Sequence, residues 1–231
     1  MSGESAFEKR YVDPKDQSKI EGILELFNLP PKVIAFLRMY KRPIQITLIV
    51  VTLVVVVGSL YKSYRERQIE DGASALALAL KETGSDKGKA LKNVSENYAS
   101  TPSALWAKVE LAHMAMAERK FADASAMYTA IHNEVKKDNP LFPLTLYGMA
   151  QAEEAQGNSD AAYAHFEELK NSVGYELTGY TGMARILEAK GELEKALGIF
   201  GQYDAMLGDS PENAGQKALV EEKIARLKAQ Q

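Results

Sequence analysis

An apolar run near residue 50 limits the possible structures of this chain more than any other feature of the sequence. The run from Pro43 to Tyr61 contains no charged residue, and basic residues bound it on both sides. A helix over this run, at about 1.5 Å per residue, covers about 28 Å, close to the thickness of the hydrocarbon core of a bilayer. Valine and isoleucine are abundant, but a backbone in lipid must satisfy its own hydrogen bonds, which favours a helix. Residues 43–61 are therefore predicted to form a single transmembrane helix.

Two other interpretations of this run fit less well. A buried core strand is usually about 4–8 residues long, so the run is too long for one. A cleaved signal peptide is disfavoured because a long segment precedes the run and no A-x-A cleavage site directly follows it. A retained membrane anchor remains the preferred interpretation.

The distribution of basic residues predicts the orientation of the span. The segment from Asn28 to Arg42 holds four Lys or Arg, and the equally long segment from Tyr61 to Ala75 holds three. The whole N-terminal tail holds eight. Because cationic flanks tend to stay in the cytoplasm, the N-terminus is predicted to be cytoplasmic and the larger domain to lie on the opposite side.

Residues 1–42 are predicted to be a cytoplasmic tail with an amphipathic elbow. Residues 1–18 are polar and charged, whereas apolar residues follow at helical spacing on both sides of Pro30 and Pro31. The second apolar stripe consists of Val33, Ile34, Leu37 and Tyr40. Two interpretations stay open: an elbow that lies on the membrane or docks on a membrane partner, and a tail that only anchors and orients the span.

An internal repeat determines the expected fold of the rest of the chain. A small alanine followed four residues later by a larger apolar residue occurs four times, as Ala90 with Val94, Ala124 with Tyr128, Ala162 with Phe166, and Ala196 with Phe200. The successive alanine spacings are 34, 38 and 34, and a period of about 34 is that of tetratricopeptide units. The spacing of 38 suggests a four-residue insertion around residues 136–139.

Other repeated positions support the same period. The tetrapeptides beginning at Gly157 and Gly191 stand one period apart, and the one beginning at Arg119 occupies the same place one unit earlier. Adjacent close-packing positions are Leu111-Ala112, Met149-Ala150 and Met183-Ala184. On these residues the segment resembles the tetratricopeptide repeat family.

The expected fold class is therefore all-α, with a single N-terminal transmembrane helix followed by an α-solenoid of tetratricopeptide-like helix pairs and a C-terminal capping helix. We expect a linker at 62–71, repeats at 72–208 and the capping helix at 209–231. A capping helix needs one apolar and one solvated face. Its apolar face is predicted to consist of Ala218, Leu219, Ile224 and Leu227.

The resemblance also implies a partner-binding groove lined by the first helix of each pair. The corresponding positions are Trp106, Val109, His113, Met116, Leu144, Tyr147, Gln151, Thr178, Thr181 and Arg185. Only Arg185 is cationic, so an apolar protein segment is expected there rather than a peptide carboxylate. Trp106 has two open interpretations, as a binding residue or as a packing contact with the neighbouring repeat.

The composition gives no sign of catalysis, cofactor binding or nucleic-acid binding. The chain has no cysteine, three separated histidines and a net charge of -3. A nucleic-acid-binding domain normally needs a basic surface, and neither a GxGxxG loop nor a GxSxG elbow is present. We therefore predict a non-enzymatic protein without metal or cofactor.

The order of anchor and repeats, with stretches such as Ala104–Ala112 and Ala189–Glu192, resembles the YfgM-like ancillary subunits of the bacterial Sec translocon. The resemblance implies a single-pass inner-membrane protein with a periplasmic repeat domain. It also implies Sec translocon subunits and a periplasmic chaperone or prolyl-isomerase-like protein as partners. The alternative is a non-enzymatic scaffold for envelope assembly or cell division.

Overall fold

The computed structural model describes residues 31–208 and 210–230, and these form two compact units. The first unit ends at Arg65 and the second begins at Glu66. Within the described ranges the secondary structure is helical and contains no strand. The predicted all-α class is confirmed.

The first unit contains α2 (Pro31–Met39) and the beginning of α3 (Lys41–Ala79). A break separates the two helices because Pro43 has no amide hydrogen to donate to the carbonyl of Met39. The residues of the second predicted apolar stripe thus lie on α2, except Tyr40, which follows the helix directly. The first stripe and the polar segment before it lie outside the described residues.

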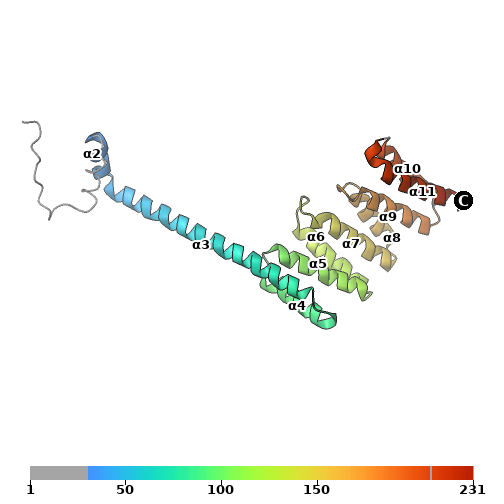
Figure 1. Ribbon diagram of the computed structural model, residues 1–231, viewed down its shortest axis with the longest axis horizontal. Coiled ribbons are helices and arrows are strands. Elements are labelled where there is room, and N and C mark those ends of the chain that lie inside the picture. The colour runs from blue at the N-terminus through green and yellow to red at the C-terminus, as the bar shows by residue number, and fades with distance from the viewer. Residues whose placement is uncertain (1–30, 209, 231) are drawn as a thin grey trace, which may run out of the picture. The chain divides into compact units, whose positions relative to one another are not determined.

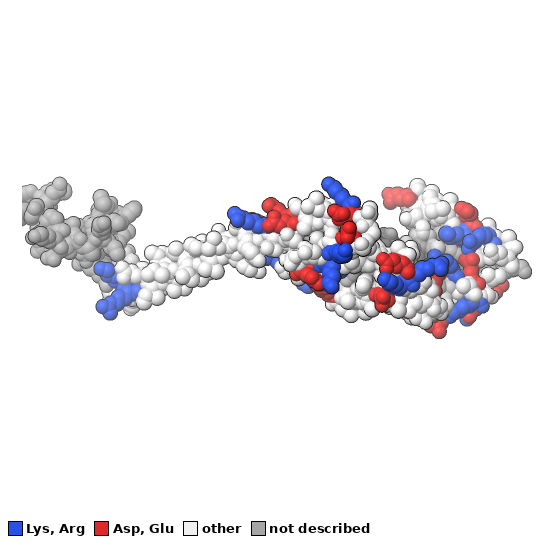
Figure 2. All heavy atoms as spheres, turned by 90° about the horizontal axis from the view of Figure 1, so that it is seen from below, with Lys and Arg blue, Asp and Glu red and all other residues white. Residues whose placement is uncertain are grey.

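The predicted span lies within α3, and its side chains are exposed. Its most apolar stretch has a mean hydropathy of 2.4, and none of it is buried. It is the one helix in the described part of the chain that is long and apolar enough to cross a membrane. The side chain of Thr52 donates a hydrogen bond of 2.9 Å to the carbonyl of Leu48, so this hydroxyl is satisfied within the helix. Charged atoms are missing from this stretch on the face drawn in Figure 2.

The linker predicted at residues 62–71 is part of a helix. The structure continues α3 through this segment to Ala79. The segment is rich in Arg, Glu and Gln, which have high helix propensity, and a glycine appears only at Gly72. The polar composition therefore marks the end of the apolar run, not the end of the helix.

The second unit is a stack of helices that follow one another in space in chain order (Figure 1). The end of α3 packs against α4 and α5 through Ala79, Leu91 and Ala107. The further helices are α4 (Gly84–Asn97), α5 (Pro102–Ala117), α6 (Phe121–Glu134), α7 (Leu141–Gln156), α8 (Ser159–Leu169), α9 (Glu176–Ala189), α10 (Leu193–Leu207) and α11 (Ala214–Lys228). This arrangement is the predicted tetratricopeptide-like solenoid.

Three of the four repeated alanines are completely buried between the packed helices. Ala124, Ala162 and Ala196 have no exposed surface, and Phe166 and Phe200 are almost completely buried. A larger side chain at these alanines would separate the helices, which explains why the period is visible in the sequence.

Two glycines let the aromatic ring of one pair press against the first helix of the next. A Cβ atom at Gly148 would lie 2.6 Å from the ring of Tyr128, and one at Gly182 would meet the ring of Phe166 even more closely. Both approaches are far below normal contact. Gly148 and Gly182 also stand one repeat period apart, so they are a further element of the repeat.

The four extra residues of the second unit of the repeat lengthen helices rather than a loop. Ten residues of α6 follow Ala124, whereas seven residues of α8 follow Ala162. The connections after α6 and after α8 are equally long, at six residues each. The insertion expected around residues 136–139 is therefore taken up largely by about one extra turn of α6.

The turns inside the helix pairs share one geometry. Gly157 and Gly191 have φ angles of 85° and 75°, and Arg119, at the same place in its pair, has 60°. In each turn the next amide donates to a carbonyl five residues back, for example from Lys120 to Ala115 at 2.9 Å. This is a Schellman-type helix end, whose left-handed residue is usually glycine.

The capping helix α11 packs against α10, but its apolar face differs from the predicted one. Val220 and Leu227 have no exposed surface, and Ile224 packs beside them, as predicted for Ile224 and Leu227. Leu219 is 47% exposed, and Ala218 is exposed as well. The buried stripe thus follows the spacing i, i+4, i+7 from Val220, one position away from Leu219.

Substituting Gly182→Ala should destabilise the repeat domain by about 2 kcal/mol, because the new methyl group collides with the ring of Phe166. The free energy of unfolding from urea denaturation tests this expectation. Gly201→Ala in α10 is the matched control, since nothing lies within 4 Å of its Cβ position. It should be neutral or stabilise by up to about 1 kcal/mol. Equal effects of the two substitutions would contradict the close packing at Gly182.

Substituting Arg119→Gly should stabilise the domain by about 1 kcal/mol, because glycine adopts the left-handed conformation without a steric penalty. The midpoint of thermal unfolding should rise by about 3 °C. Gly157→Ala, at the equivalent position, should shift the midpoint in the opposite direction. A lower midpoint for Arg119→Gly would show that this turn does not have the described geometry.

Candidate partner-binding surface

The candidate surface is the solvent-facing side of α5, α7 and α9, here called the first-helix face. The structure leaves Trp106, His113 and Arg185 exposed. Five more of the predicted residues, as well as Thr178, are half-buried: Met116, Leu144, Tyr147, Gln151 and Thr181. These residues come from three helices that stack through α6 and α8.

Val109 was predicted to line this surface, and the structure shows that this was wrong. Its side chain has no exposed surface and packs with Ile131 of α6 and Leu141 of α7. The same position in the next pair is Tyr147, which also packs against the core but is long enough for its hydroxyl to reach a polar partner. The position therefore points inward, and only a long side chain emerges from it.

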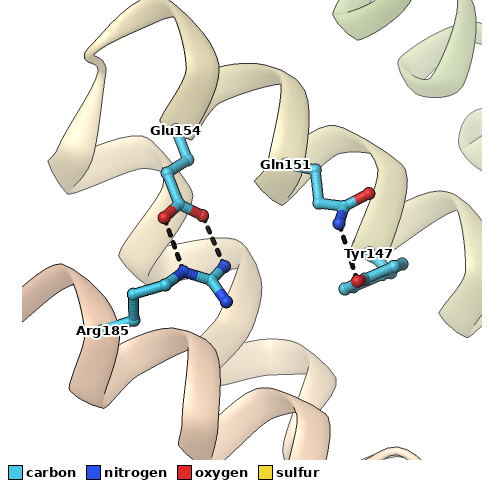
Figure 3. Close-up of polar contacts among 4 residues, drawn as sticks. All are labelled: Tyr147, Gln151, Glu154 and Arg185. Carbon is cyan, nitrogen blue, oxygen red and sulfur yellow. Dashed lines mark hydrogen bonds and ion pairs between the residues drawn. The ribbon is translucent and has the colours of Figure 1, made fainter. Parts of the chain in front are cut away.

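Tyr147 and Gln151 form a hydrogen-bonded pair on α7 (Figure 3). The side-chain amide of Gln151 donates to the hydroxyl oxygen of Tyr147 at 2.7 Å. The ring of Tyr147 meets that of Phe166 edge-on, with 6.4 Å between the ring centroids. These contacts hold both side chains in place, while part of each stays exposed to solvent and accessible to a partner.

The only cation among the predicted residues is neutralised by an acid. Arg185 donates two hydrogen bonds to the carboxylate of Glu154, at 2.7 Å from Nε and 2.6 Å from Nη2 (Figure 3). The guanidinium also lies 5.5 Å from the centroid of the ring of Phe166. The hydrogen bonds to Glu154 keep the pKa of Arg185 above its usual value. A peptide carboxylate would have to compete with Glu154 for this side chain.

A second charged pair lies at the α5 end of the face. Lys87 of α4 lies 3.2 Å from Glu110 of α5, and the other carboxylate oxygen of Glu110 is 3.7 Å from Nδ1 of His113. The ring of His113 also lies beside that of Tyr128, with 5.9 Å between the centroids. Burial and the nearby charge of Glu110 raise the pKa of Tyr128 to about 12, so its hydroxyl stays neutral.

Trp106 is the largest apolar side chain exposed on α5. It is 44% exposed, although the preceding Leu105 and the following Ala107 both pack into the core. An indole in this position offers a partner a large apolar area at a low cost in conformational entropy. The structure thus leaves Trp106 available for binding.

Sequence analysis did not anticipate two hollows that lie away from the predicted residues. One of 560 Å³ lies between α4, α5 and α6, where Leu111, Met114 and Met127 provide apolar lining. Another of 600 Å³ lies beside the connections after α6 and α8, near Phe142 and Val173. The first is lined by three successive helices, and the second by two connections and the helix ends beside them. Neither therefore corresponds to a pattern within a single helix.

In the described part of the chain, no three His, Cys, Asp or Glu side chains are grouped so that they could hold a metal ion. Glu153 accepts hydrogen bonds of 2.6 Å from Ser125 and 2.7 Å from Asn158. These bonds lower the pKa of Glu153, and their position between α6, α7 and α8 gives them a structural role.

Stacked helix pairs with an exposed first-helix face define a helical repeat protein, and such repeats indicate a scaffold for protein–protein interaction. A family model described as tetratricopeptide repeat-like domain matches residues 35–229. The chain belongs to this family. No significant match was found among curated protein sequences.

Among solved structures, the chain is similar to TPR-like repeats assigned to a kinesin light chain of Podosopora anserina. The identity is 18%, with 72% of this chain and 94% of that chain covered and a TM-score of 0.45 for a Q17M variant. It is also similar to SycD, the type III secretion translocator chaperone of Yersinia enterocolitica. The identity to SycD is 19%, with 64% of this chain and 96% of SycD covered and a TM-score of 0.43.

The ion pair between Glu154 and Arg185 should contribute less than about 1 kcal/mol, because 30% and 49% of the two side chains are exposed. A double-mutant cycle with Glu154→Gln and Arg185→Gln measures the coupling free energy. The pair of Asp160 with Lys190 is the control, since Asp160 is 97% exposed and should show no measurable coupling. A coupling above about 2 kcal/mol would mean that the pair holds α7 and α9 together.

Proposed function

We propose that the chain is a membrane-anchored adaptor that binds other proteins through the first-helix face of its repeat domain. In this proposal α3 crosses the bacterial inner membrane once, the N-terminus is cytoplasmic, and the repeat domain lies in the periplasm. The partners are subunits of the Sec translocon and a periplasmic chaperone or prolyl-isomerase-like protein.

The exposure of the apolar part of α3 supports the anchor. For example, Leu48 is 66% exposed and Val55 is 64% exposed. In water this part of α3 would present a continuous apolar surface along many helical turns. Soluble proteins rarely expose apolar patches of this size, whereas lipid accepts them. Tyr61 and Tyr64 follow directly and are exposed, as aromatic residues at a membrane interface are. The family match also includes the apolar run.

The character of the first-helix face carries the proposal about partners. Trp106, Leu144 and Tyr147 offer apolar area that is only partly buried, and Gln151 adds a hydrogen-bonding group. Arg185 is paired with Glu154, so the face lacks the open cation that an acidic peptide end would need. Such a face best fits an uncharged, apolar segment of a protein.

The translocon role rests on the resemblance between this chain and YfgM-like subunits in the order of anchor and repeats. An adaptor held at the membrane beside a channel would meet emerging apolar segments before they fold. The alternative is a scaffold for envelope assembly or cell division, which would use the same face for a folded partner.

Photo-crosslinking in living cells tests this proposal, with a crosslinking amino acid placed at Trp106 or Tyr147 and the products identified by mass spectrometry. We expect crosslinks to translocon subunits, to periplasmic chaperones or to nascent secreted chains. Met127 is the control position, since it is 40% exposed and apolar but lies at the hollow beside α4.

Three outcomes separate the hypotheses. Crosslinks from Trp106 and Tyr147 but not from Met127 support the first-helix face. A dominant crosslink to a division or envelope-assembly protein moves the function to the scaffold alternative. Crosslinks from Met127 alone would contradict the choice of surface.

A further inference from the structure

We propose that α2 is an interfacial helix that lies on the anionic lipid surface next to the span and seats an acyl chain against α3. This inference rests on the proposed membrane anchor, and it assigns a partner to a segment that the anchor alone does not require. The proposed occupant of this site is the acyl chain of a lipid.

Several apolar side chains of α2 and of the residue that follows it are exposed. Val33 is 40% exposed, Phe36 56% and Tyr40, just after the helix, 44%. These three lie at the spacing i, i+3, i+7, so they share one side of the helix. Within the described residues this side of the nine-residue helix is left uncovered, and such a helix has little stability of its own in water. The boundary of the acyl chains would cover it.

A hollow in the crook between α2 and α3 continues this apolar side onto the span. Its volume is 410 Å³, and its lining includes Phe36, Tyr40, Pro43, Ile44, Leu48 and Val51. The rings of Phe36 and Tyr40 contact each other at a tilt of 42°, with 4.8 Å between their centroids. No charged residue lines the hollow, so its chemistry matches a hydrocarbon chain.

The charges around the crook match an anionic surface. Residues 31–42 contain the cations Lys32, Arg38, Lys41 and Arg42, and no Asp or Glu occurs between residue 31 and Glu66. In Figure 2 Lys and Arg atoms gather at the start of α3, and no Asp or Glu atom of the coloured residues lies beside them. Each cation close to an anionic leaflet adds to membrane binding, and long basic side chains can keep their charge among the headgroups.

The depth of the segment is consistent with an interfacial position. Tyr40 and Tyr61 are separated by about 31 Å along a helix, which is close to the thickness of the hydrocarbon core. A tyrosine at each end of the run is typical of the two membrane interfaces. Because α2 ends one residue before Tyr40, the helix would lie at the level of the headgroup layer.

The test uses the full chain, which has no cysteine and therefore accepts single labels cleanly. Val33→Cys, Val54→Cys and Glu222→Cys each carry an environment-sensitive fluorophore and report on α2, the span and the repeat domain. The proteins are reconstituted into vesicles of phosphatidylcholine, or of an equal mixture with phosphatidylglycerol, that contain shallow or deep lipid-bound quenchers.

We expect the label at Val33 to be quenched from shallow lipid positions and the label at Val54 from deep ones, whereas the label at Glu222 stays in water. Quenching at Val33 should be stronger in the anionic mixture. Lys41→Gln and Arg42→Gln should each reduce the ratio of embedded to exposed label about fivefold in that mixture.

The outcomes separate this inference from the anchor on which it rests. A label at Val33 that is as exposed as that at Glu222, while Val54 is quenched, overturns the interfacial helix and leaves the anchor intact. A label at Val54 that lipid does not quench overturns the anchor itself. Equal quenching at Val33 in both lipids overturns the anionic preference. The same label is also read in native membranes, and protection at Val33 there but not in vesicles assigns α2 to a protein partner and overturns the inference.

Discussion

The contact between Phe166 and Gly182 is the one on which both the stack and its candidate surface depend. Because Gly182 has no side chain, the backbone of α9 approaches the fully buried ring to a distance that no other residue would allow. The same ring meets Tyr147 edge-on and lies beneath the guanidinium of Arg185. One aromatic side chain therefore determines the spacing of two helix pairs and the positions of two residues on the first-helix face.

Anchor and repeats divide the proposed task between them. The repeats bury small residues such as Ala162 and Ala196 so that their first helices can stack in register and leave Trp106 on the surface. The proposed anchor does the opposite, because α3 exposes apolar side chains that lipid would accept better than water. An adaptor near a channel needs both properties, a fixed place in the membrane and a rigid face for partners.

The sequence predicts the repeating part of this structure and the long apolar helix. The apolar run and the alanines at a period of about 34 are local patterns, and both predicted their helices correctly. Val109 was misplaced because a family position identifies a side of a helix, while its burial depends on Ile131 and Leu141 from other helices. The hollow at Met127 likewise forms only after three helices have packed. The burial of single side chains and the position of hollows depend on how the helices pack, which helix propensity does not predict.

The central claim is that partners bind on the first-helix face, and the single tryptophan of the chain reports on it directly. The measurement is the fluorescence of Trp106 during titration of the full chain with an unfolded, tryptophan-free secretory chain, whose binding is followed separately by anisotropy. The account predicts a blue shift of the emission and weaker quenching by acrylamide as binding saturates, because the exposed indole becomes covered. Saturable binding with an unchanged Trp106 spectrum, or no binding at all, would contradict it.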